Sequence, residues 1–167
     1  TGGWLTRESA QLYDTQVEVL FAGAGAAMRR VGLGLLLGAL RGRDQRTLRV
    51  LDLACGNGAF LRELLRALPR LKAIGLDLSP AYVEEAKTAL APWRQGELVV
   101  GAAETMPFED ASLDAVSCIY LFHELPPRVR VDVAREIARV LKPGGLFLFV
   151  DSIQGGETPA LDQMLEY

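Results

Sequence analysis

Residues 50–60 read Val50-Leu51-Asp52-Leu53-Ala54-Cys55-Gly56-Asn57-Gly58-Ala59-Phe60. The first part is a short apolar run of the kind that forms a buried strand, and the last part opens an apolar helical pattern. Between them lies a Gly-x-Gly turn, where missing side chains let a ligand approach the backbone and the N-terminus of the helix. The stretch predicts a strand, a binding turn and a helix. Taken alone, it also fits an ordinary strand-to-helix turn.

Short apolar runs and amphipathic helical patterns alternate along the rest of the chain. The predicted strands are residues 49–54, 73–78, 97–101, 113–120 and 146–151. Three apolar stripes with helical spacing lie between them: Phe60, Leu61, Leu64, Leu65 and Leu68; Val83, Ala86 and Leu90; and Val129, Val133, Ile137 and Leu141. Ser79-Pro80 starts the second helix, and Lys142-Pro143-Gly144-Gly145 ends the third. Strands that alternate with helices along a chain pair with one another in parallel. We therefore expect an α/β fold, a doubly wound sheet of about five parallel strands with helices on both faces.

The composition is that of one globular domain. The chain has 167 residues, of which 50% are hydrophobic and 23% are charged, and its net charge is −3. This balance argues against a nucleic-acid-binding surface over the whole molecule. Cys55 and Cys118 lie in apolar surroundings, which fits reduced thiols in a cytoplasmic protein. No cluster of Cys, His and Asp has metal-ligand spacing, so no metal is expected.

Residues 17–40, before the first predicted strand, are strongly apolar. Met28-Arg29-Arg30 interrupts them, and residues 31–40 are too few to span a bilayer, so no integral membrane segment is expected. The favoured interpretation is a helix, or two helices broken around the glycines, packed on the core. The alternative is an interfacial helix or a lid over an apolar substrate. The six arginines of residues 29–49 fit a solvated face better than a phosphate site, since no aromatic residues interleave with them.

Acidic side chains stand at the ends of the second and third predicted strands. Ligands bind outside the carboxyl ends of the strands in such a sheet, so these residues are candidate binding residues. Asp77 follows Asp52 by 25 residues and can accept both hydroxyls of a ribose. Its alternative role, capping the next helix, is better filled by Ser79. Glu104 can accept a hydrogen bond from an exocyclic amine, although an isolated loop glutamate more often faces solvent.

Together these residues resemble class I S-adenosylmethionine-dependent methyltransferases, of the kind seen in ubiquinone and menaquinone biosynthesis and among related small-molecule enzymes. The ordered motifs that carry the resemblance are residues 50–58, Gly75-Leu76-Asp77-Leu78-Ser79, Ala103-Glu104 with Met106-Pro107-Phe108, Leu113-Asp114-Ala115-Val116, and Glu136-Ile137 with Val140-Leu141-Lys142-Pro143-Gly144-Gly145. The resemblance implies a Rossmann-like fold and the cofactor S-adenosylmethionine, which is converted to S-adenosylhomocysteine. It also implies methyl transfer to a small molecule by in-line displacement, and the apolar residues 17–40 favour an apolar acceptor.

The resemblance implies a set of cofactor contacts as well. Ala54, Gly56 and Gly58 would lie against the methionine part of the cofactor, and Asp52 would support the loop or bind the amino group. Asp77 would bind the ribose hydroxyls, and Leu78, Ala103 and Glu104 would contact the adenine. Ile119 and Tyr120 would lie at the sulfonium side, and Tyr13, by a looser match, would complete the pocket.

Two rival interpretations concern the function. A dinucleotide-dependent oxidoreductase also uses a glycine turn followed by an acidic residue. Here the third glycine of that fingerprint is absent, because the turn continues as Gly56-Asn57-Gly58-Ala59-Phe60-Leu61. The second rival is a module that binds S-adenosylmethionine without catalysis. We prefer the methyltransferase.

The sequence leaves the catalytic residues unassigned. A sulfonium methyl is already activated, so a general base is needed only for an acceptor such as a hydroxyl or a carbon acid. His123, the only histidine, follows the fourth predicted strand on the ligand-facing side and could act as this base or serve in packing and orientation. Asp151 is a weaker candidate.

We expect three parts in the chain: residues 1–48 as a helical cover, residues 49–154 as the cofactor-binding core, and residues 155–167 as the start of a C-terminal helix. The chain begins at Thr1 and ends at Tyr167 inside that predicted helix, which suggests a piece of a longer protein. The family usually continues with an antiparallel strand pair. Without it, the fifth strand becomes an exposed edge through which two copies could pair as a homodimer.

Overall fold

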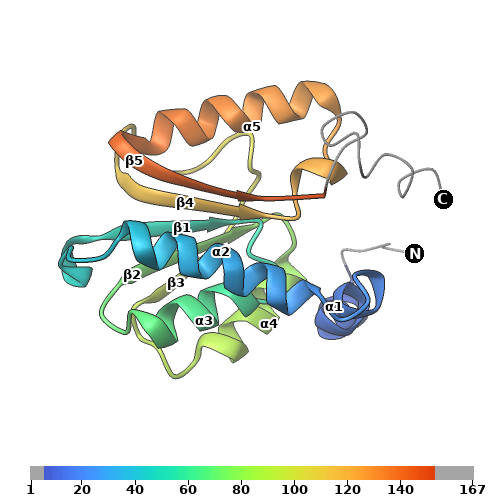
Figure 1. Cartoon of the computed structure of the whole chain (residues 1–167). Coiled ribbons are helices and arrows are strands. Elements are labelled where there is room, and N and C mark those ends of the chain that lie inside the picture. The colour runs from blue at the N-terminus through green and yellow to red at the C-terminus, as the bar shows by residue number, and fades with distance from the viewer. Residues whose placement is uncertain (1–5, 153–167) are drawn as a thin grey trace, which may run out of the picture.

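The computed structural model describes residues 6–152, which form a five-stranded sheet with all strands parallel. The strands lie in the order β3-β2-β1-β4-β5, with helices on both faces (Figure 1). The chain moves outward from β1 to β3 and then crosses to the far side of β1, so the strand order reverses at β1. The predicted α/β, Rossmann-like doubly wound sheet is confirmed, and no antiparallel strand occurs within residues 6–152.

Strands and helices alternate along most of the chain. The strands are β1 (Arg49–Leu53), β2 (Lys72–Asp77), β3 (Gly96–Val100), β4 (Leu113–Ile119) and β5 (Leu141–Val150). The helices are α1 (Arg7–Leu20), α2 (Gly25–Ala39), α3 (Ala59–Ala67), α4 (Pro80–Leu90) and α5 (Pro127–Val140), with short 3-10 turns η2 (Gln45–Thr47) and η3 (Phe122–Glu124). The first four strands match the predicted ranges within one residue at each end.

The fifth strand is longer than predicted. It begins at Leu141, so the segment 142–145, which we predicted to be a turn before the strand, lies inside it. The pairing with β4 jumps from Leu113↔Leu141 to Ala115↔Leu146, which leaves this segment as an irregularity at the edge of the sheet. An edge strand tolerates the proline there because no neighbour needs its missing N–H. The assignment of Leu141 to a helical stripe is therefore wrong.

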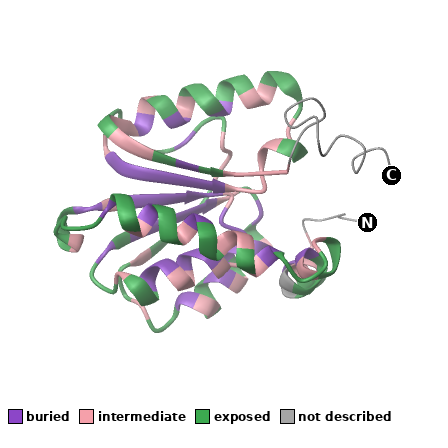
Figure 2. Ribbon diagram, viewed as in Figure 1, coloured by how far each residue is buried: buried purple, intermediate pink, exposed green. Residues whose placement is uncertain are grey.

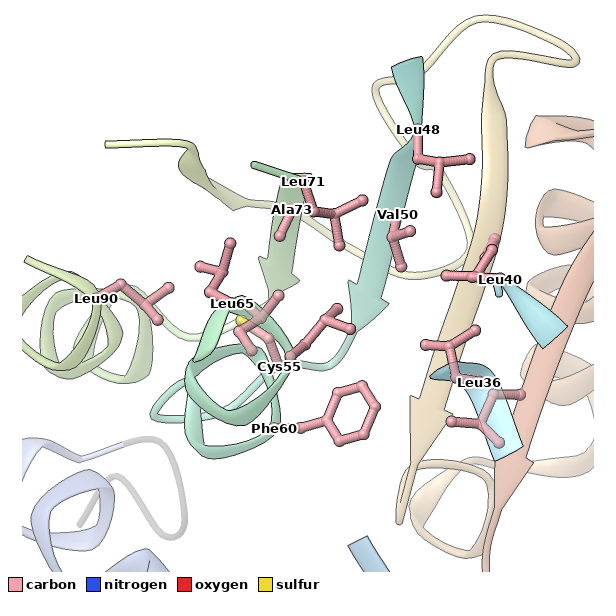
Figure 3. Close-up of a cluster of buried hydrophobic side chains, with 14 residues drawn as sticks. Leu36, Leu40, Leu48, Val50, Cys55, Phe60, Leu65, Leu71, Ala73 and Leu90 are labelled. Carbon is pink, nitrogen blue, oxygen red and sulfur yellow. The ribbon is translucent and has the colours of Figure 1, made fainter. Parts of the chain in front are cut away.

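Helices α2, α3 and α4 cover one face of the sheet. Their apolar side chains meet the strands in a buried cluster, in which Leu36 of α2, Phe60 and Leu65 of α3 pack toward Val50 of β1 and Ala73 of β2 (Figure 3). The hydrophobic spacing read from the sequence thus places the correct side of each helix on the sheet. Leu68, which we placed in the first stripe, follows α3 as its C-cap and is partly buried against the same cluster.

Helix α5 covers the opposite face. Its residues Val133, Ile137 and Val140 are buried against a second cluster that includes Leu51 of β1 and Val116 of β4. Because successive strand residues point to opposite faces, β1 is buried on both sides (Figure 2). Such a strand, fixed by packing above and below, gives the turn that follows it a rigid base.

Both cysteines are buried and free of disulfides, as predicted. Burial raises the pKa of the Cys55 thiol and of the Cys118 thiol, so both are held in the neutral form.

The apolar segment 17–40 forms parts of two helices that meet at a sharp corner. The break falls at Ala22 and Gly23, which both adopt positive φ angles of 49° and 84°. Glu18 holds the corner, because its Oε1 accepts the backbone N–H of Ala26 at 2.6 Å and lies 3.4 Å from the guanidinium of Arg29. The interpretation as two helices broken at a glycine is confirmed, and the corner directs α1 across the end of the sheet (Figure 1).

β5 forms one edge of the sheet, and its outer side has no strand partner within residues 6–152. The C-terminal helix that we predicted in residues 155–167 lies outside the described residues, and a homodimer through this edge stays a prediction. None of the helices formed by the described residues is both long enough and apolar enough to span a bilayer.

Candidate functional site

A cavity of about 770 Å³ lies at the carboxyl ends of the strands, and α1 lines one side of it. Its walls come from α1 and its C-terminal end, the turn after β1, the end of β2 with Tyr82 of α4, the segments that follow β2 and β3, and the segment from the end of β4 through η3. The lining residues are Leu12, Tyr13, Thr15, Gln16, Val17, Val19, Leu20, Phe21, Ala54, Gly56, Leu76, Asp77, Leu78, Tyr82, Gly101, Ala102, Ala103, Glu104, Ile119, Tyr120, Leu121, His123, Glu124 and Leu125. The position matches the general rule for ligand sites in open parallel sheets.

Hydrogen bonds join the turn after β1 to the end of β2. Oδ2 of Asp77 accepts the backbone N–H of Gly56 at 2.9 Å, and Oδ1 accepts the backbone N–H of Ser79 at 2.9 Å. Burial raises the pKa of Asp77, while these two hydrogen bonds act against that rise. Each carboxylate oxygen keeps a further acceptor site. Asp77 therefore fixes the turn and can still accept hydrogen bonds from a ligand in the cavity.

Positive φ angles shape the turn. Ala54 and Gly56 adopt φ angles of 56° and 55°, and both residues line the cavity. A Cβ at Gly56 would lie 3.6 Å from a ring carbon of Tyr13 on α1, so a side chain there would occupy the space between the turn and the helix. Glycine thus keeps the backbone of the turn open to the cavity.

Two of the predicted contacts, Gly58 at the end of the turn and Asp52 in β1, are not among the residues that line the cavity. Gly58 caps α3 with φ 80°, and a Cβ there would stand 3.2 Å from the Cβ of Ala86 on α4. Its conformation lets α3 and α4 approach closely.

Asp52 is buried in the sheet, 3% exposed, and its Oδ1 accepts the hydroxyl of Ser117 on β4 at 2.7 Å. Burial raises the pKa of Asp52 to about 7, and the nearby carboxylate of Asp77 contributes to the rise, whereas the Ser117 hydrogen bond lowers it. The side chain ties β1 to β4 directly below the turn.

Aromatic side chains join α1 to α4. The rings of Tyr13 and Tyr82 meet edge to face with centroids 5.4 Å apart, and the Tyr82 hydroxyl lies 3.2 Å from the Ser9 hydroxyl. Both tyrosines line the cavity, and a contact of Tyr13 with the cofactor stays a prediction. Tyr82 carried no signal in the sequence beyond its place in an amphipathic helix.

The segments after β2 and β3 form another wall. Leu78, Ala103 and Glu104 line the cavity there, and Leu78 is 61% exposed. The backbone N–H of Gly101 donates to the carbonyl of Asp77 at 2.9 Å, which holds the two segments together. The structure therefore brings these three predicted residues to one side, next to Asp77.

The end of β4 forms the remaining wall. Ile119 and Tyr120 both line the cavity, and Tyr120 adopts a positive φ of 59°. Its ring stacks on Phe21 at the end of α1, with centroids 5.0 Å apart and an interplanar angle of 23°. The sequence did not indicate Phe21, Val19 or Leu20 as site residues one by one. The sequence indicated only that residues 17–40 as a whole are apolar.

His123 lies on η3 and lines the same wall. Its Nδ1 is 2.6 Å from Oδ1 of Asp151, and its Nε2 is 3.2 Å from Oε1 of Glu124. The other oxygen of Asp151 accepts the backbone N–H of Phe122 at 2.7 Å. Asp151, which follows β5, thus orients η3 and the histidine ring from behind.

The charges of the lining have one sign. Among the described residues, the lining includes the carboxylates Asp77, Glu104 and Glu124 and no lysine or arginine. Such a lining favours a ligand with positive charge and disfavours one that carries phosphates. No group of three or more His, Cys, Asp or Glu side chains within residues 6–152 is placed to hold a metal ion.

Comparison with known proteins establishes the family. The family described as "Methyltransferase domain" matches residues 50–145, from β1 into β5. The chain belongs to this family. A demethylmenaquinone methyltransferase from Thermotoga maritima is 34% identical over 142 residues, which are 85% of this chain and 57% of that protein. A phthiotriol/phenolphthiotriol dimycocerosates methyltransferase from Mycobacterium leprae is 38% identical over 104 residues, which are 62% of this chain and 37% of that protein.

A solved structure is also similar to this chain in fold and in sequence. The YcgJ protein from Bacillus subtilis has a TM-score of 0.67 and 31% identity to this chain, and the alignment covers 81% of this chain and 56% of that one. The resemblance to class I S-adenosylmethionine-dependent methyltransferases is therefore confirmed for the family. The chain spans little more than half the length of the Thermotoga relative.

Proposed function

We propose that this protein binds S-adenosylmethionine and transfers its methyl group to a small, apolar molecule. The observation that carries the proposal is the lining of the cavity: an open glycine turn beside Asp77, with carboxylates and no cationic side chain among its described residues. S-adenosylmethionine carries a positive sulfonium, whereas a nicotinamide dinucleotide carries two phosphates that this lining would repel. The same lining argues against the oxidoreductase interpretation.

The predicted contact residues fit the parts of this cofactor. The backbone at Ala54 and Gly56 faces the cavity without a side chain at Gly56. Asp77 retains acceptor capacity for the two hydroxyls of a ribose. Leu78 and Ala103 offer apolar area for an adenine. In this proposal Asp52 and Gly58 act from outside the lining, by supporting the conformation of the turn.

The bound cofactor supplies a methyl group that is already activated as a sulfonium. The protein's own residues then have two tasks, to align the acceptor with that methyl group and to exclude water. Helix α1 serves both, because it covers the cavity with residues that are apolar or uncharged.

In this proposal the acceptor binds between the C-terminal end of α1 and the end of β4, where the lining is largely apolar. Val19 and Leu20 are each 76% exposed, although they line the cavity, and the stacked pair of Phe21 and Tyr120 offers a flat aromatic surface beside them. Burying such side chains against an acceptor is favourable by about 25 cal/mol per Å² of apolar surface. Two of the similar proteins are named as methyltransferases of demethylmenaquinone and of phthiotriol dimycocerosates, which agrees with an apolar acceptor.

Calorimetry tests cofactor binding. We expect the protein to bind S-adenosylmethionine and S-adenosylhomocysteine and not to bind NADH. Asp77→Asn should weaken binding by roughly 10–100-fold, because hydrogen bonds to a charged group contribute about 1.5–3 kcal/mol. Asp132→Asn, at an exposed position of α5, is the matched control and should bind like the wild type. If the folded wild type binds neither ligand, the proposal is wrong.

Two further measurements complete the test. If Asp77→Asn loses its fold, Glu104→Gln in the same lining provides a milder change, and we expect it to weaken binding by roughly threefold or more. A methyl-transfer screen with phenols, hydroquinones, amines and thiols tests turnover. Binding without turnover of any acceptor would favour the alternative, a non-catalytic module.

A further inference from the structure

We propose that His123 is the general base of the transfer, held by Asp151, and that the acceptor is consequently a hydroxyl or an enolic carbon that must lose a proton. This inference rests on the proposed methyltransferase function and adds the acceptor class. It requires that Nε2 of His123 face the acceptor and that the ring proton sit on Nδ1.

The hydrogen bonds around Asp151 define its role. Its Oδ1 lies 2.6 Å from Nδ1 of His123 and accepts the backbone N–H of Ser152 at 2.8 Å, while its Oδ2 accepts the N–H of Phe122 at 2.7 Å. A carboxylate is an acceptor only, so the short contact places a proton on Nδ1. The Asp151 side chain is only 5% exposed, and a charge that is so buried and bonded holds the ring in one tautomer.

The second ring nitrogen is the reactive one. With the proton on Nδ1, neutral His123 has its lone pair on Nε2, and the residue lines the cavity with 30% of its side chain exposed. Oε1 of Glu124 lies 3.2 Å from Nε2, a contact that suits a protonated Nε2. The Glu124 side chain is 66% exposed, so it can turn into solvent, and the proposal requires that it does so before Nε2 accepts the proton of the acceptor. After the proton has moved to Nε2, the Asp151 carboxylate still accepts the hydrogen bond from Nδ1.

The ionisable groups around the ring come from several elements. They are Asp151 after β5 and Glu124 on η3 itself, while the residues of α1 that line the cavity are uncharged. Asp77 and Glu104 lie in the same lining. No arginine or lysine is among the described residues of the lining.

The proton and the electrons balance in this step. The acceptor O–H bond breaks as its proton moves to Nε2. In a hydroxyl acceptor, the oxygen then forms the bond to the methyl carbon. In an enol, the electron pair left on oxygen forms the carbonyl, and the pair of the C=C bond forms the bond between the enolic carbon and the methyl carbon. The pair of electrons of the broken C–S bond stays on sulfur, which becomes neutral. An amine or an ionised thiol would not need the base, so His123 selects for acceptors that are weak acids.

Nuclear magnetic resonance tests the tautomer without any turnover. His123 is the only histidine, so the ¹⁵N signals of a labelled full chain report this ring alone. We expect the neutral ring to carry its proton on Nδ1, and we expect Asp151→Asn to shift a large part of the population to Nε2–H. A wild-type ring with the proton on Nε2 would overturn the proposal, since that nitrogen could then not accept one.

Kinetics test the role of the base. His123→Asn keeps an N–H donor toward Asp151 but cannot take up a proton. We expect its kcat with a hydroquinone to fall by about 100-fold or more, with KM little changed, and Asp151→Asn to lose roughly tenfold. With 4-nitrophenol at a pH where it is already ionised, the deficit of His123→Asn should shrink to a few-fold. Asp132→Asn is the control and should retain wild-type rates.

The kinetic and binding data separate the possible failures. If His123→Asn turns over the hydroquinone within threefold of the wild type, the base assignment is wrong although the proposed function stands. The same holds if only amines or thiols are methylated. If the wild type does not bind S-adenosylmethionine, the proposed function itself fails.

Discussion

The turn after β1 and the helix α1 both line the cavity, but they are held in different ways. The backbone of the turn is held by hydrogen bonds to a carboxylate, because Asp77 accepts the N–H groups of Gly56 and Ser79. The turn also follows β1, a strand that is buried on both faces. Helix α1 is attached by side chains, through Tyr13 and Tyr82 and through the Glu18 corner. The turn is thus a rigid wall of the cavity, fixed by the core of the sheet, whereas α1 is a docked wall, attached to the surface of that core.

This difference matches the parts that a methyl-transfer site needs. A cofactor common to many enzymes can be bound by a rigid wall, whereas the acceptor must enter and leave. Segments with exposed apolar side chains and few buried contacts open at a lower free-energy cost than core strands. Leu12, Val19 and Leu20 of α1 are exposed in this way. We therefore expect substitutions below the turn to affect global stability and those under α1 to affect local opening.

Asp52→Asn should have the largest effect, and its size should depend on pH. The folded pKa of Asp52 is about 7, against an ordinary value of 3.8, so between these values the native state keeps a proton that the unfolded chain has lost. This contribution to stability is fully present at low pH and is lost as the pH rises through about 7. The asparagine variant lacks it, so its stability relative to the wild type should rise by up to about 4 kcal/mol from pH 4 to pH 8.

Urea unfolding at several pH values measures this difference. Asp132→Asn, in an exposed position, serves as the matched control, and its stability relative to the wild type should stay nearly constant with pH. A flat difference for Asp52→Asn as well would show that the buried carboxylate is not protonated in the native state.

Gly75→Ala should destabilise the wall below the turn by about 1–3 kcal/mol, the range for an overpacked core. A Cβ at Gly75 in β2 would lie 2.6 Å from Leu61, 2.7 Å from Leu98 and 2.8 Å from Cys55. In contrast, Gly34 in α2 has no atom within 4 Å of such a Cβ. Gly34→Ala should therefore stabilise the protein by about 0.5–1 kcal/mol, because alanine favours the helix. Thermal unfolding of both variants gives the comparison, and equal effects would contradict it.

Tyr82→Phe should have a small effect that is confined to α1. It removes the contact of the Tyr82 hydroxyl with Ser9, 3.2 Å away, which contributes about 0.5–1.5 kcal/mol. Hydrogen exchange should show faster exchange of the amides of α1 and unchanged protection of β1 and β4. Loss of protection throughout the sheet would mean that α1 belongs to the core.

The sequence predicted the rigid wall better than the docked one. Gly56 and Asp77 follow strands whose apolar runs are short and clear, and the rule that ligands bind at the carboxyl ends of parallel strands places them together. Gly58 and Asp52 belong to the same motif, yet they are not among the residues that line the cavity, because the motif encodes the conformation of the backbone as well as its contacts. A motif shows which residues form a structure but does not separate those that touch a ligand from those that support it.

The helical cover was predicted only as an apolar segment. The spacing of residues 17–40 indicates helices, but the direction of α1 depends on a corner at Gly23 and on the contacts of Glu18, which link positions that no periodicity relates. The stacking of Phe21 on Tyr120 likewise joins residues nearly a hundred positions apart. Such contacts arise from packing in three dimensions.

Local patterns of sequence therefore determined the order of strands and helices, the parallel sheet and the acidic residues at the carboxyl ends of its strands. The reason is that hydrophobic spacing and turn residues act over a few positions. Tertiary structure alone decided the pairing of His123 with Asp151, the raised pKa of Asp52 and the uniform sign of charge in the cavity. Each depends on distances and burial between segments far apart in the chain, and the free energy of a buried charge or hydrogen bond exists only once those segments meet.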